Sequence, residues 1–443
     1  MKKVVDTWAG GFDSLLFFPG TTCWVLGKSL AKQSISIIPK IRERMHCSNL
    51  AEKGRTMKIK RNKIYIILIV ALCLFLSLGI YKSGIFNKRS TSKPITLNVS
   101  LYKSLPHYDS FEKTVEECWS EKHPDVKLNF EDWDCYSRTL PEDLDVFVLD
   151  ALNLDSFVEK GYLLALSEGN LQDYNDLISP FAEGCRVNGK IYAVPQLLCT
   201  ELLYTRKVDA DLKNADSVND LFAAIDEPGL LLDKTSSPTM YLQALVDCKQ
   251  QYMDQYPPIE AETLSSEAVD SLEKIIKMRL TDPEYVSKKG DRFYYAQQFA
   301  GDVGRAYIGY SEAMDMMGES ASEMDFRLFS MTDDENIPVF YMDAAAVNAK
   351  ISDEKKTLAL ELLNMITSSD TLVRVSMNNG DPRYLLLARR SAYDTLASDY
   401  PIYKEMKKVA LVPNAHVFRI KPDGDEYLEE AEKNKDLLPS LID

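Results

Sequence analysis

The chain has 443 residues, of which 45% are hydrophobic and 10% aromatic, enough for two domains or one large two-lobed body, and this excludes a disordered protein. Residues 1–93 carry 17 Lys and Arg against 4 Asp and Glu, which leaves 35 basic and 63 acidic residues, a formal charge of −28, for residues 94–443. So acidic a body argues against nucleic acid as a partner and fits either a small cationic ligand or merely a soluble surface.

An apolar segment precedes the acidic body. Eighteen uncharged residues, 64–81, follow the basic cluster 57–63, and at about 1.5 Å per residue they span roughly 27 Å, close to the thickness of a bilayer core. Together with a polar linker, residues 57–93 predict either a signal peptide or an uncleaved membrane anchor. Both alternatives predict a secreted or extracytoplasmic body that meets the membrane only through the apolar segment.

The segment before Met57 has no hydrophobic periodicity, and an export signal normally begins a chain. We therefore expect residues 1–56 to be a targeting extension or a misassigned start, with no function assigned to them.

The number and spacing of the cysteines limit which disulfides and metal sites the protein can form. Five of the eight follow the apolar segment, an odd number, so at least one thiol of an exported body stays free. The sequence has no CxxC motif and no Cys/His cluster, so we expect no zinc site. The five cysteines are Cys118, Cys135, Cys185, Cys199 and Cys248.

The body opens with alternating strands and helices. Residues 95–102 and 126–133 alternate apolar and polar side chains as strands do, and residues 145–150 predict a short buried strand. Residues 109–124 predict a capped helix between the first two strands. The order β-α-β-β is typical of an α/β domain.

The later elements continue the mixed pattern. Asn188-Gly189 predicts a turn before a β-segment. Further elements are helices at 237–252 and 265–280, a strand running into a helix at 304–317, a strand at 337–350 and a capped helix at 351–367.

This order predicts an α/β fold of two lobes with a cleft between them, because the chain crosses between the lobes more than once. We expect the first lobe to comprise residues 94–200 and a returning segment near 335–370. The second lobe should be mostly residues 201–334, together with the C-terminal helices.

Cys199 lies in the stretch VPQLLCTELLY, where an apolar run meets Thr200 and Glu201. Free cysteines are among the most buried residue types, so inert packing is one interpretation. Chemistry is favoured by its place at the end of a β-like stretch, from which side chains of an α/β cleft project. Acids are abundant in the body and histidines scarce, so the base for a reactive thiol should be Asp or Glu.

Glu312 is the best candidate for that base. It follows the run AYIGYS, with Tyr307 and Tyr310, where a strand gives way to a helix. Burial among aromatic rings moves the pKa of a carboxyl toward the working pH that a general base needs. The alternative is a carboxylate at a helix N-terminus that interacts only with the helix dipole.

Aromatic and acidic residues recur at the predicted strand ends. A cleft lined by tyrosines and carboxylates suits a flat, positively charged heterocycle, through stacking, cation–π attraction and ion pairing. Taken singly, each aromatic could equally belong to the core. The residues are Tyr102, Trp133 to Tyr136, Asp150, Tyr341 and Asp343.

These features resemble two related groups of proteins. The opening strand, the strand 145–150 and the segment NGKIYAVP are similar to those of extracellular solute-binding proteins of the periplasmic type. Across residues 94–440 the chain also resembles the bacterial thiaminase I (thiamine pyridinylase) family, whose two-lobed architecture is of the periplasmic-binding-protein type II. The resembling stretches are LNVSLY, EDWDCYS, DLDVFVLD, NGKIYAVPQLLCTELLYTRK, SPTMYLQALVD, GRAYIGYSE, IPVFYMD, DPRYLLLARR and DYPIYKEM.

The resemblance implies roles for individual residues. Cys199 of PQLLCT corresponds to the family's nucleophile and Glu312 of GYSE to the base that activates it. The chain departs from the family at Ser104, where relatives carry a tyrosine, and near Phe293, where a family tyrosine is replaced. The residues implied to line a thiamine pocket are Tyr102, Tyr136, Asp150, Tyr310, Tyr341 and Asp343.

The implied activity is displacement of the thiazole of thiamine by a small organic nucleophile, such as an amine, a pyridine or a thiol, through a covalent cysteine–pyrimidine adduct. The enzyme would be a monomer without metal or cofactor. Two rival interpretations remain. One is a solute-binding protein for thiamine or another small cation, which would tolerate the loss of Cys199. The other is a structural protein whose helical middle docks a partner.

Overall fold

The computed structural model describes residues 95–225, 228–232, 243, 247, 265–280, 293–333 and 336–419, which belong to one compact unit of the chain. The predicted extension 1–56, the segment 57–93 and nearly all of the helix 237–252 lie outside the described residues. In the described part, no helix is long and apolar enough to cross a membrane.

The larger of two main sheets has the strand order β14-β6-β11-β3-β1-β2, with β15 paired to β11. Strands β2, β1 and β3 are parallel, whereas β11 runs antiparallel to both β3 and β6. The small side chains of Ala344, Ala345 and Ala346 are fully buried, and every residue of β11 except the half-buried Tyr341 is buried in the middle of the sheet. The strands are β1 (Thr96–Ser100), β2 (Lys127–Phe130), β3 (Val146–Asp150), β6 (Val194–Cys199), β11 (Val339–Val347), β14 (Leu386–Leu387) and β15 (His416–Val417).

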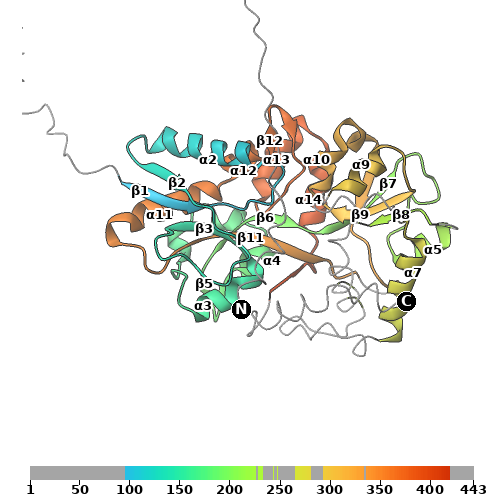
Figure 1. Ribbon diagram of the computed structural model, residues 1–443, viewed down its shortest axis with the longest axis horizontal. Helices are drawn as coiled ribbons and strands as arrows, with labels where there is room; N and C mark the ends of the chain where they lie inside the picture. Colours follow the sequence, from blue (N-terminus) through green and yellow to red (C-terminus); the bar gives the residue numbers. More distant parts are fainter. Residues whose placement is uncertain are drawn as a thin grey trace, which may run out of the picture. The chain divides into compact units, whose positions relative to one another are not determined.

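Helices cover both faces of this sheet. In Figure 1, α2 and α12 lie along one side of strands β1 and β3, and α3 and α4 lie on the other. The helices are α2 (Tyr108–Lys122), α3 (Leu154–Glu159), α4 (Ser179–Gly184), α11 (Asp353–Ile366), α12 (Ser369–Val375), α13 (Arg390–Asp399) and α14 (Ile402–Ala410).

The described C-terminal helices pack with this larger sheet. Helix α12 contacts α2, and α13 and α14 contact β14, which is paired with β6. This corrects the expectation that the C-terminal helices belong to the second lobe. The chain returns to the first lobe through β11 and stays there to Arg419, because β14 and β15 add to the same sheet.

The smaller sheet has the order β10-β7-β9-β8 and carries its own hydrophobic core. On α7 the buried residues Ala268, Leu272, Ile275 and Met278 recur every three or four positions, which places one face of the helix against that core. The elements are β7 (Glu201–Arg206), β8 (Leu230–Leu232), β9 (Ala306–Tyr310), β10 (Met324–Arg327), α5 (Val218–Ala224), α7 (Ser266–Met278), α9 (Tyr294–Ala300) and α10 (Ala313–Met317).

Short elements complete the described part. Asn188 and Gly189 have φ of 50° and 76° and join two short strands, so the predicted turn is confirmed. The short elements are η1 (Ala151–Asn153), η2 (Glu168–Asn170), η3 (Tyr174–Asp176), η6 (Gly318–Glu323), β4 (Arg186–Val187), β5 (Lys190–Ile191), β12 (Met377–Asn378) and β13 (Asp381–Pro382).

Two predicted helix caps are wrong. Helix α2 begins at Tyr108, after His107 in a left-handed conformation, and no side chain caps it. Ser352 occupies the N-cap position of α11, but its side chain makes no capping hydrogen bond. Packing against the sheet holds both helices, because their buried faces contact strands or other helices of the first lobe.

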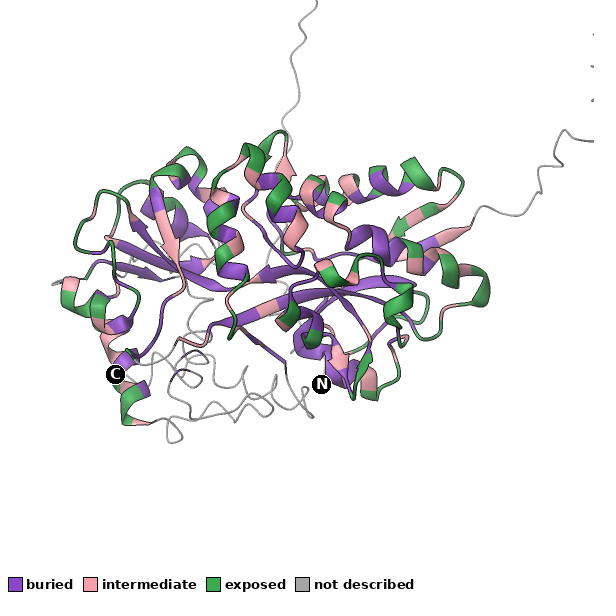
Figure 2. Ribbon diagram, turned by 180° about the vertical axis from the view of Figure 1, so that it is seen from behind, coloured by how far each residue is buried: buried purple, intermediate pink, exposed green. Residues whose placement is uncertain are grey.

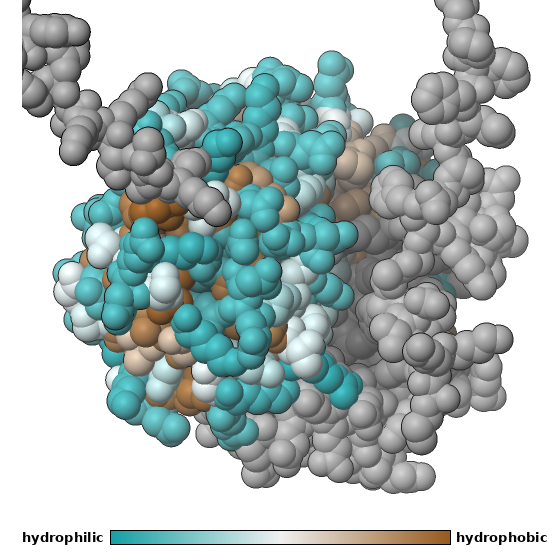
Figure 3. Space-filling model, turned by 60° about the vertical axis from the view of Figure 1, so that its left-hand side comes forward, coloured by the Kyte–Doolittle hydropathy of each residue, from teal (hydrophilic) through white to brown (hydrophobic). Residues whose placement is uncertain are grey.

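Two sheets, each with helices around it, confirm the two-lobed α/β fold. Figure 2 shows that the strands of both sheets are largely buried, whereas the helices turn exposed residues outward. On the face seen in Figure 3, hydrophilic residues predominate and hydrophobic ones form small patches between them.

Candidate active site

The connection between the two sheets brings Cys199 and Glu312 together. Strands β6 and β7 follow one another directly, with Thr200 between them. In the antiparallel β7–β9 ladder Glu201 lies opposite Tyr310, and the next residue along, Ser311, donates its backbone N–H to the carbonyl oxygen of Thr200 at 3.2 Å. One further step in this register sets Glu312 opposite Cys199.

The side chains of this pair are in contact. Sγ of Cys199 lies 3.2 Å from Oε2 and 3.5 Å from Oε1 of Glu312. Glu312 is only 5% exposed, whereas Cys199 is partly exposed. A small molecule can therefore reach the sulfur while the protein shields the carboxylate from water. A carboxylate in hydrogen-bond contact with a thiol can accept its proton and generate the nucleophilic thiolate.

The segment that carries Glu312 is fixed by buried groups. Oγ of Ser311 donates to Oε2 of Glu312 at 3.3 Å. The hydroxyl of Tyr204, on β7, donates to the carbonyl oxygen of Tyr310 at 3.0 Å. Ser311 and Tyr204 are 1% and 0% exposed, so these hydrogen bonds are protected from competing water.

Gly309 is required by the packing of β9. A Cβ atom at this position would overlap the hydroxyl and ring of Tyr307, two residues earlier on the same strand. The Tyr307 ring in turn stacks on Tyr204, with the ring centroids 5.4 Å apart. The glycine of the GYSE motif thus makes room for the aromatic pair beneath the Glu312 segment.

Strand β11 connects the thiol to two carboxylates. Tyr341 lies opposite Cys199 on β6, and Asp343 lies opposite Asp150 on β3. Tyr341 and Asp343 are two residues apart on one strand, so their side chains share a face of the sheet, as do their cross-strand partners. Cys199, Tyr341, Asp343 and Asp150 therefore lie on one face, in adjacent strands.

The two carboxylates are buried in a region that disfavours negative charge. Asp150 and Asp343 are 5% and 7% exposed. Burial raises the pKa of Asp150 to about 6, although its carboxylate accepts a hydrogen bond from the N–H of Leu152 at 2.8 Å. Burial, with the nearby carboxyls of Asp343 and Asp150, also raises the pKa of the Cys135 thiol. A cationic group bound here would offset this cost of burying negative charge.

Four tyrosines complete the set of predicted residues. The hydroxyls of Tyr102 and Tyr136, from the loops after β1 and β2, lie 3.3 Å apart. The rings of Tyr310 and Tyr341 meet edge to face, with centroids 6.2 Å apart. Tyr136 is 43% exposed, the highest exposure among these four tyrosines.

The two positions at which the chain departs from the family differ in environment. Ser104 is exposed on the loop that follows Tyr102, and Phe293 is buried in front of helix α9.

The site is rich in acids and carries no cluster suited to a metal. Among the described residues there is no group of three or more His, Cys, Asp or Glu side chains that could hold a metal ion. The four described cysteines, Cys118, Cys135, Cys185 and Cys199, form no disulfide.

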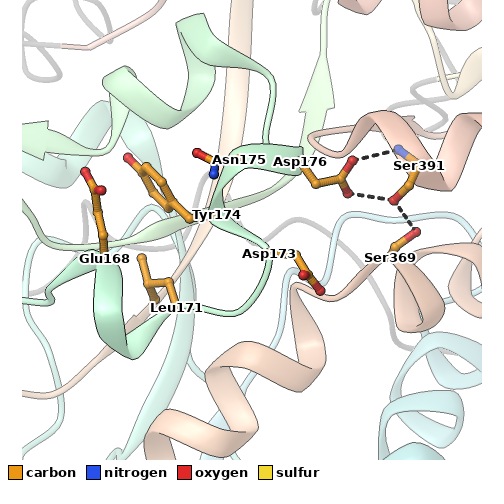
Figure 4. A pocket seen from close by; sticks show the side chains of 8 residues that line it. All are labelled: Glu168, Leu171, Asp173, Tyr174, Asn175, Asp176, Ser369 and Ser391. Atoms are coloured by element: carbon orange, nitrogen blue, oxygen red, sulfur yellow. Dashed lines mark hydrogen bonds between the residues drawn. The ribbon is translucent and has the colours of Figure 1, made fainter.

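A surface pocket of about 600 Å³ lies elsewhere, and neither Cys199 nor Glu312 lines it (Figure 4). Asp176 accepts hydrogen bonds from the backbone N–H and the hydroxyl of Ser391, at 3.0 and 2.6 Å. Glu168 forms a 2.6 Å ion pair with Arg186. The carboxylates of Asp176 and Glu168 in this pocket are thus held by other protein groups. No thiol or imidazole lines the pocket, so the pocket offers no nucleophile comparable to Cys199.

Two residues of the candidate site were not predicted. Ser311 belongs to the GYSE motif and Tyr204 ends the stretch VPQLLCTELLY, but neither motif by itself indicates a role for these two side chains. The period-2 pattern of β7 and β9 was the available signal, but which residues face each other depends on strand register.

Comparison with known proteins gives consistent matches. The model of the Thiaminase-1 domain matches residues 200–332. The chain is 37% identical to Thiaminase-1 of Paenibacillus thiaminolyticus over 372 residues, which cover 79% of this chain and 89% of that protein.

Similar solved structures agree with the sequence matches. The structure of thiaminase I from Bacillus thiaminolyticus matches with a TM-score of 0.72 and 35% identity, over 79% of this chain and all of that one. Clostridium botulinum thiaminase I in complex with thiamin matches with a TM-score of 0.71 and 38% identity, over 78% and 99%. The maltose-bound MalE3 of T. maritima, at 16% identity and a TM-score of 0.60 over 79% and 94%, shares the fold alone.

Proposed function

Because the chain belongs to the thiaminase I family, we propose that it is a thiamine-degrading transferase, a thiamine pyridinylase, in which Cys199 is the nucleophile and Glu312 its base. The observation that carries the proposal is the 3.2 Å contact between the Cys199 sulfur and the Glu312 carboxylate. The relative from Clostridium botulinum, solved in complex with thiamin, supports thiamine as the substrate.

Substrate binding follows from the charges and rings of the site. Thiamine carries a cationic thiazolium and a flat aminopyrimidine. Asp150 and Asp343, buried and directly opposite each other, would stabilise the aminopyrimidine and its positively charged forms. The tyrosines would hold the flat rings by stacking and cation–π attraction. These are Tyr102, Tyr136, Tyr310 and Tyr341.

The first half of the reaction forms a covalent adduct. Glu312 accepts the thiol proton, and the Cys199 thiolate adds to C6 of the electron-poor pyrimidine. The electrons released by this addition expel the thiazole from the bridging methylene, and the cationic ring leaves as a neutral molecule. Nucleophilic catalysis thus replaces one difficult displacement by two easier steps.

The second half regenerates the enzyme. An amine, pyridine or thiol adds to the exocyclic methylene of the adduct, and the carbon–sulfur bond breaks to restore the aromatic pyrimidine. When the nucleophile carries a proton, that proton is released to solvent, directly or through Glu312, and the thiol regains the one that Glu312 took. Neither half needs a metal or an oxidant.

The same Cys199–Glu312 contact favours the enzyme over a solute-binding protein. Reversible binding of thiamine needs the carboxylates and the tyrosines but no partly exposed thiol beside a buried base. A receptor would therefore bind thiamine without releasing thiazole.

We further propose that the protein works as a monomer outside the cytoplasm. The apolar segment 64–81 supports export, whether it is cleaved or retained as an anchor. Analysis of the mature N-terminus by mass spectrometry, and of the mass in solution by light scattering, tests both statements.

Incubation of the protein with thiamine and aniline tests the proposed reaction. We expect stoichiometric release of free thiazole and formation of the aniline–pyrimidine product, detected by liquid chromatography. Binding of thiamine without thiazole release would instead assign the protein as a solute receptor.

A further inference from the structure

Ser311 forms hydrogen bonds to Glu312 and to the residue that follows Cys199. Its side chain donates to Oε2 of Glu312, and its backbone N–H donates to the carbonyl oxygen of Thr200, the residue after Cys199. Its own carbonyl oxygen accepts from the Tyr204 hydroxyl at 3.4 Å. All its polar groups are therefore engaged, at 1% exposure.

One oxygen of the Glu312 carboxylate lies close to both the Ser311 hydroxyl and the Cys199 thiol. Oε2 of Glu312 lies 3.3 Å from Oγ of Ser311 and 3.2 Å from Sγ of Cys199. A hydroxyl that donates to a buried carboxylate fixes the rotation of that carboxylate. When the carboxyl is protonated, the same hydroxyl can rotate and accept a hydrogen bond, so it can serve both states of the base.

From this geometry we infer that Ser311 is a positioning residue for the reaction, which aims the Glu312 carboxylate at the Cys199 sulfur. The inference rests on the proposed function for its kinetic consequence, but its effect on the reactivity of the thiol does not need thiamine.

Ser311→Ala removes the hydroxyl and little else. The free energy of a hydrogen bond to a charged group corresponds to a factor of about 10 to 100 in a rate constant, so we expect kcat to fall by that factor. KM for thiamine should stay within about twofold, because Ser311 acts through Glu312 and does not belong to the proposed thiamine pocket. Ser311→Thr, which keeps the hydroxyl, should recover most of the loss.

Alkylation of Cys199 by iodoacetamide gives a second measurement. We expect its rate in Ser311→Ala to fall by a similar factor, with modification at Cys199 resolved from the other cysteines by peptide mass spectrometry. Ser271→Ala is the matched control: Ser271 is 3% exposed and its Oγ donates to the carbonyl oxygen of Met331 at 2.6 Å, so the same substitution removes another buried hydroxyl. This control should alkylate at the wild-type rate.

The two proposals fail in different ways. If wild-type protein releases no thiazole, the proposed function is wrong, while the alkylation rates still test Ser311. If wild type is active and Ser311→Ala keeps both its kcat and its alkylation rate within twofold, the role of Ser311 is refuted. A Ser311→Ala protein that loses only thermal stability, or only affinity for thiamine, refutes it as well.

Discussion

The sulfur of Cys199 lies 3.2 Å from the carboxylate of Glu312 across 113 residues of sequence. Cys199 is the last residue of β6, Glu312 precedes helix α10 two residues after the end of β9, and the β7–β9 register, continued beyond the strands, sets them opposite each other. This relationship makes the effects of substitutions predictable.

Replacing Cys199 with Ser should lower thiazole release by at least about a thousandfold, because an alcohol is a far weaker acid than a thiol of pKa about 8.5 and is not ionised by a neighbouring carboxylate. Thiamine binding, measured by calorimetry, should survive. Substantial turnover in the variant would rule out the covalent mechanism.

Replacing Glu312 with Gln keeps the size of the side chain but removes its ability to accept a proton. We expect kcat to fall by about 10²- to 10⁴-fold, the usual range for loss of a general base. Because the thiolate can also form by raising the pH, activity should recover partly in alkaline buffer. A variant with unchanged rate at neutral pH would show that another group deprotonates the thiol.

Asp150 should make the free protein less stable as the pH rises. Burial raises its pKa to about 6, so between about pH 4 and 6 the folded protein holds a proton that the unfolded chain releases. The contribution of Asp150 to the unfolding free energy is complete below about pH 4 and is lost by about pH 6. At 1.36 kcal/mol per pH unit, the unfolding free energy changes by up to about 3 kcal/mol over this range.

The Asp150→Asn variant isolates this effect. Its unfolding free energy, measured in urea across the pH range, should lack the Asp150 contribution, so the difference from wild type should grow in favour of the variant as the pH rises from 4 to 6. Asp247, whose pKa burial also raises to about 6, is unchanged in both proteins. A difference that is constant with pH would contradict the prediction.

Gly309→Ala should destabilise the smaller lobe. The added methyl group overlaps the Tyr307 ring, which is confined by Tyr204, and overpacking of this kind costs about 1–3 kcal/mol. Because the Glu312 segment rests on these rings, kcat should fall too. Gly169→Ala is the control: the atom nearest to its added methyl group would be Ser167 Oγ at 3.9 Å, so this variant should unfold at the wild-type urea midpoint.

Local patterns in the sequence were enough to predict many elements. The alternation in residues 95–102 predicts β1, the short apolar run in 145–150 predicts β3, and the spacing in 265–280 predicts α7, because these patterns depend only on near neighbours. The Asn-Gly turn also followed from local backbone preferences. The residue types of PQLLCT and GYSE predicted which thiol and which carboxylate to test.

The tertiary structure alone decided which of these residues meet. Nothing local in the sequence states that Asp150 lies opposite Asp343, that Cys199 contacts Glu312, or that the C-terminal helices return to the first lobe. Strand partners and register are chosen by burial of side chains distant in sequence, and a slip of one residue would turn each side chain to the opposite face. Only the folded chain therefore sets the geometry of the site.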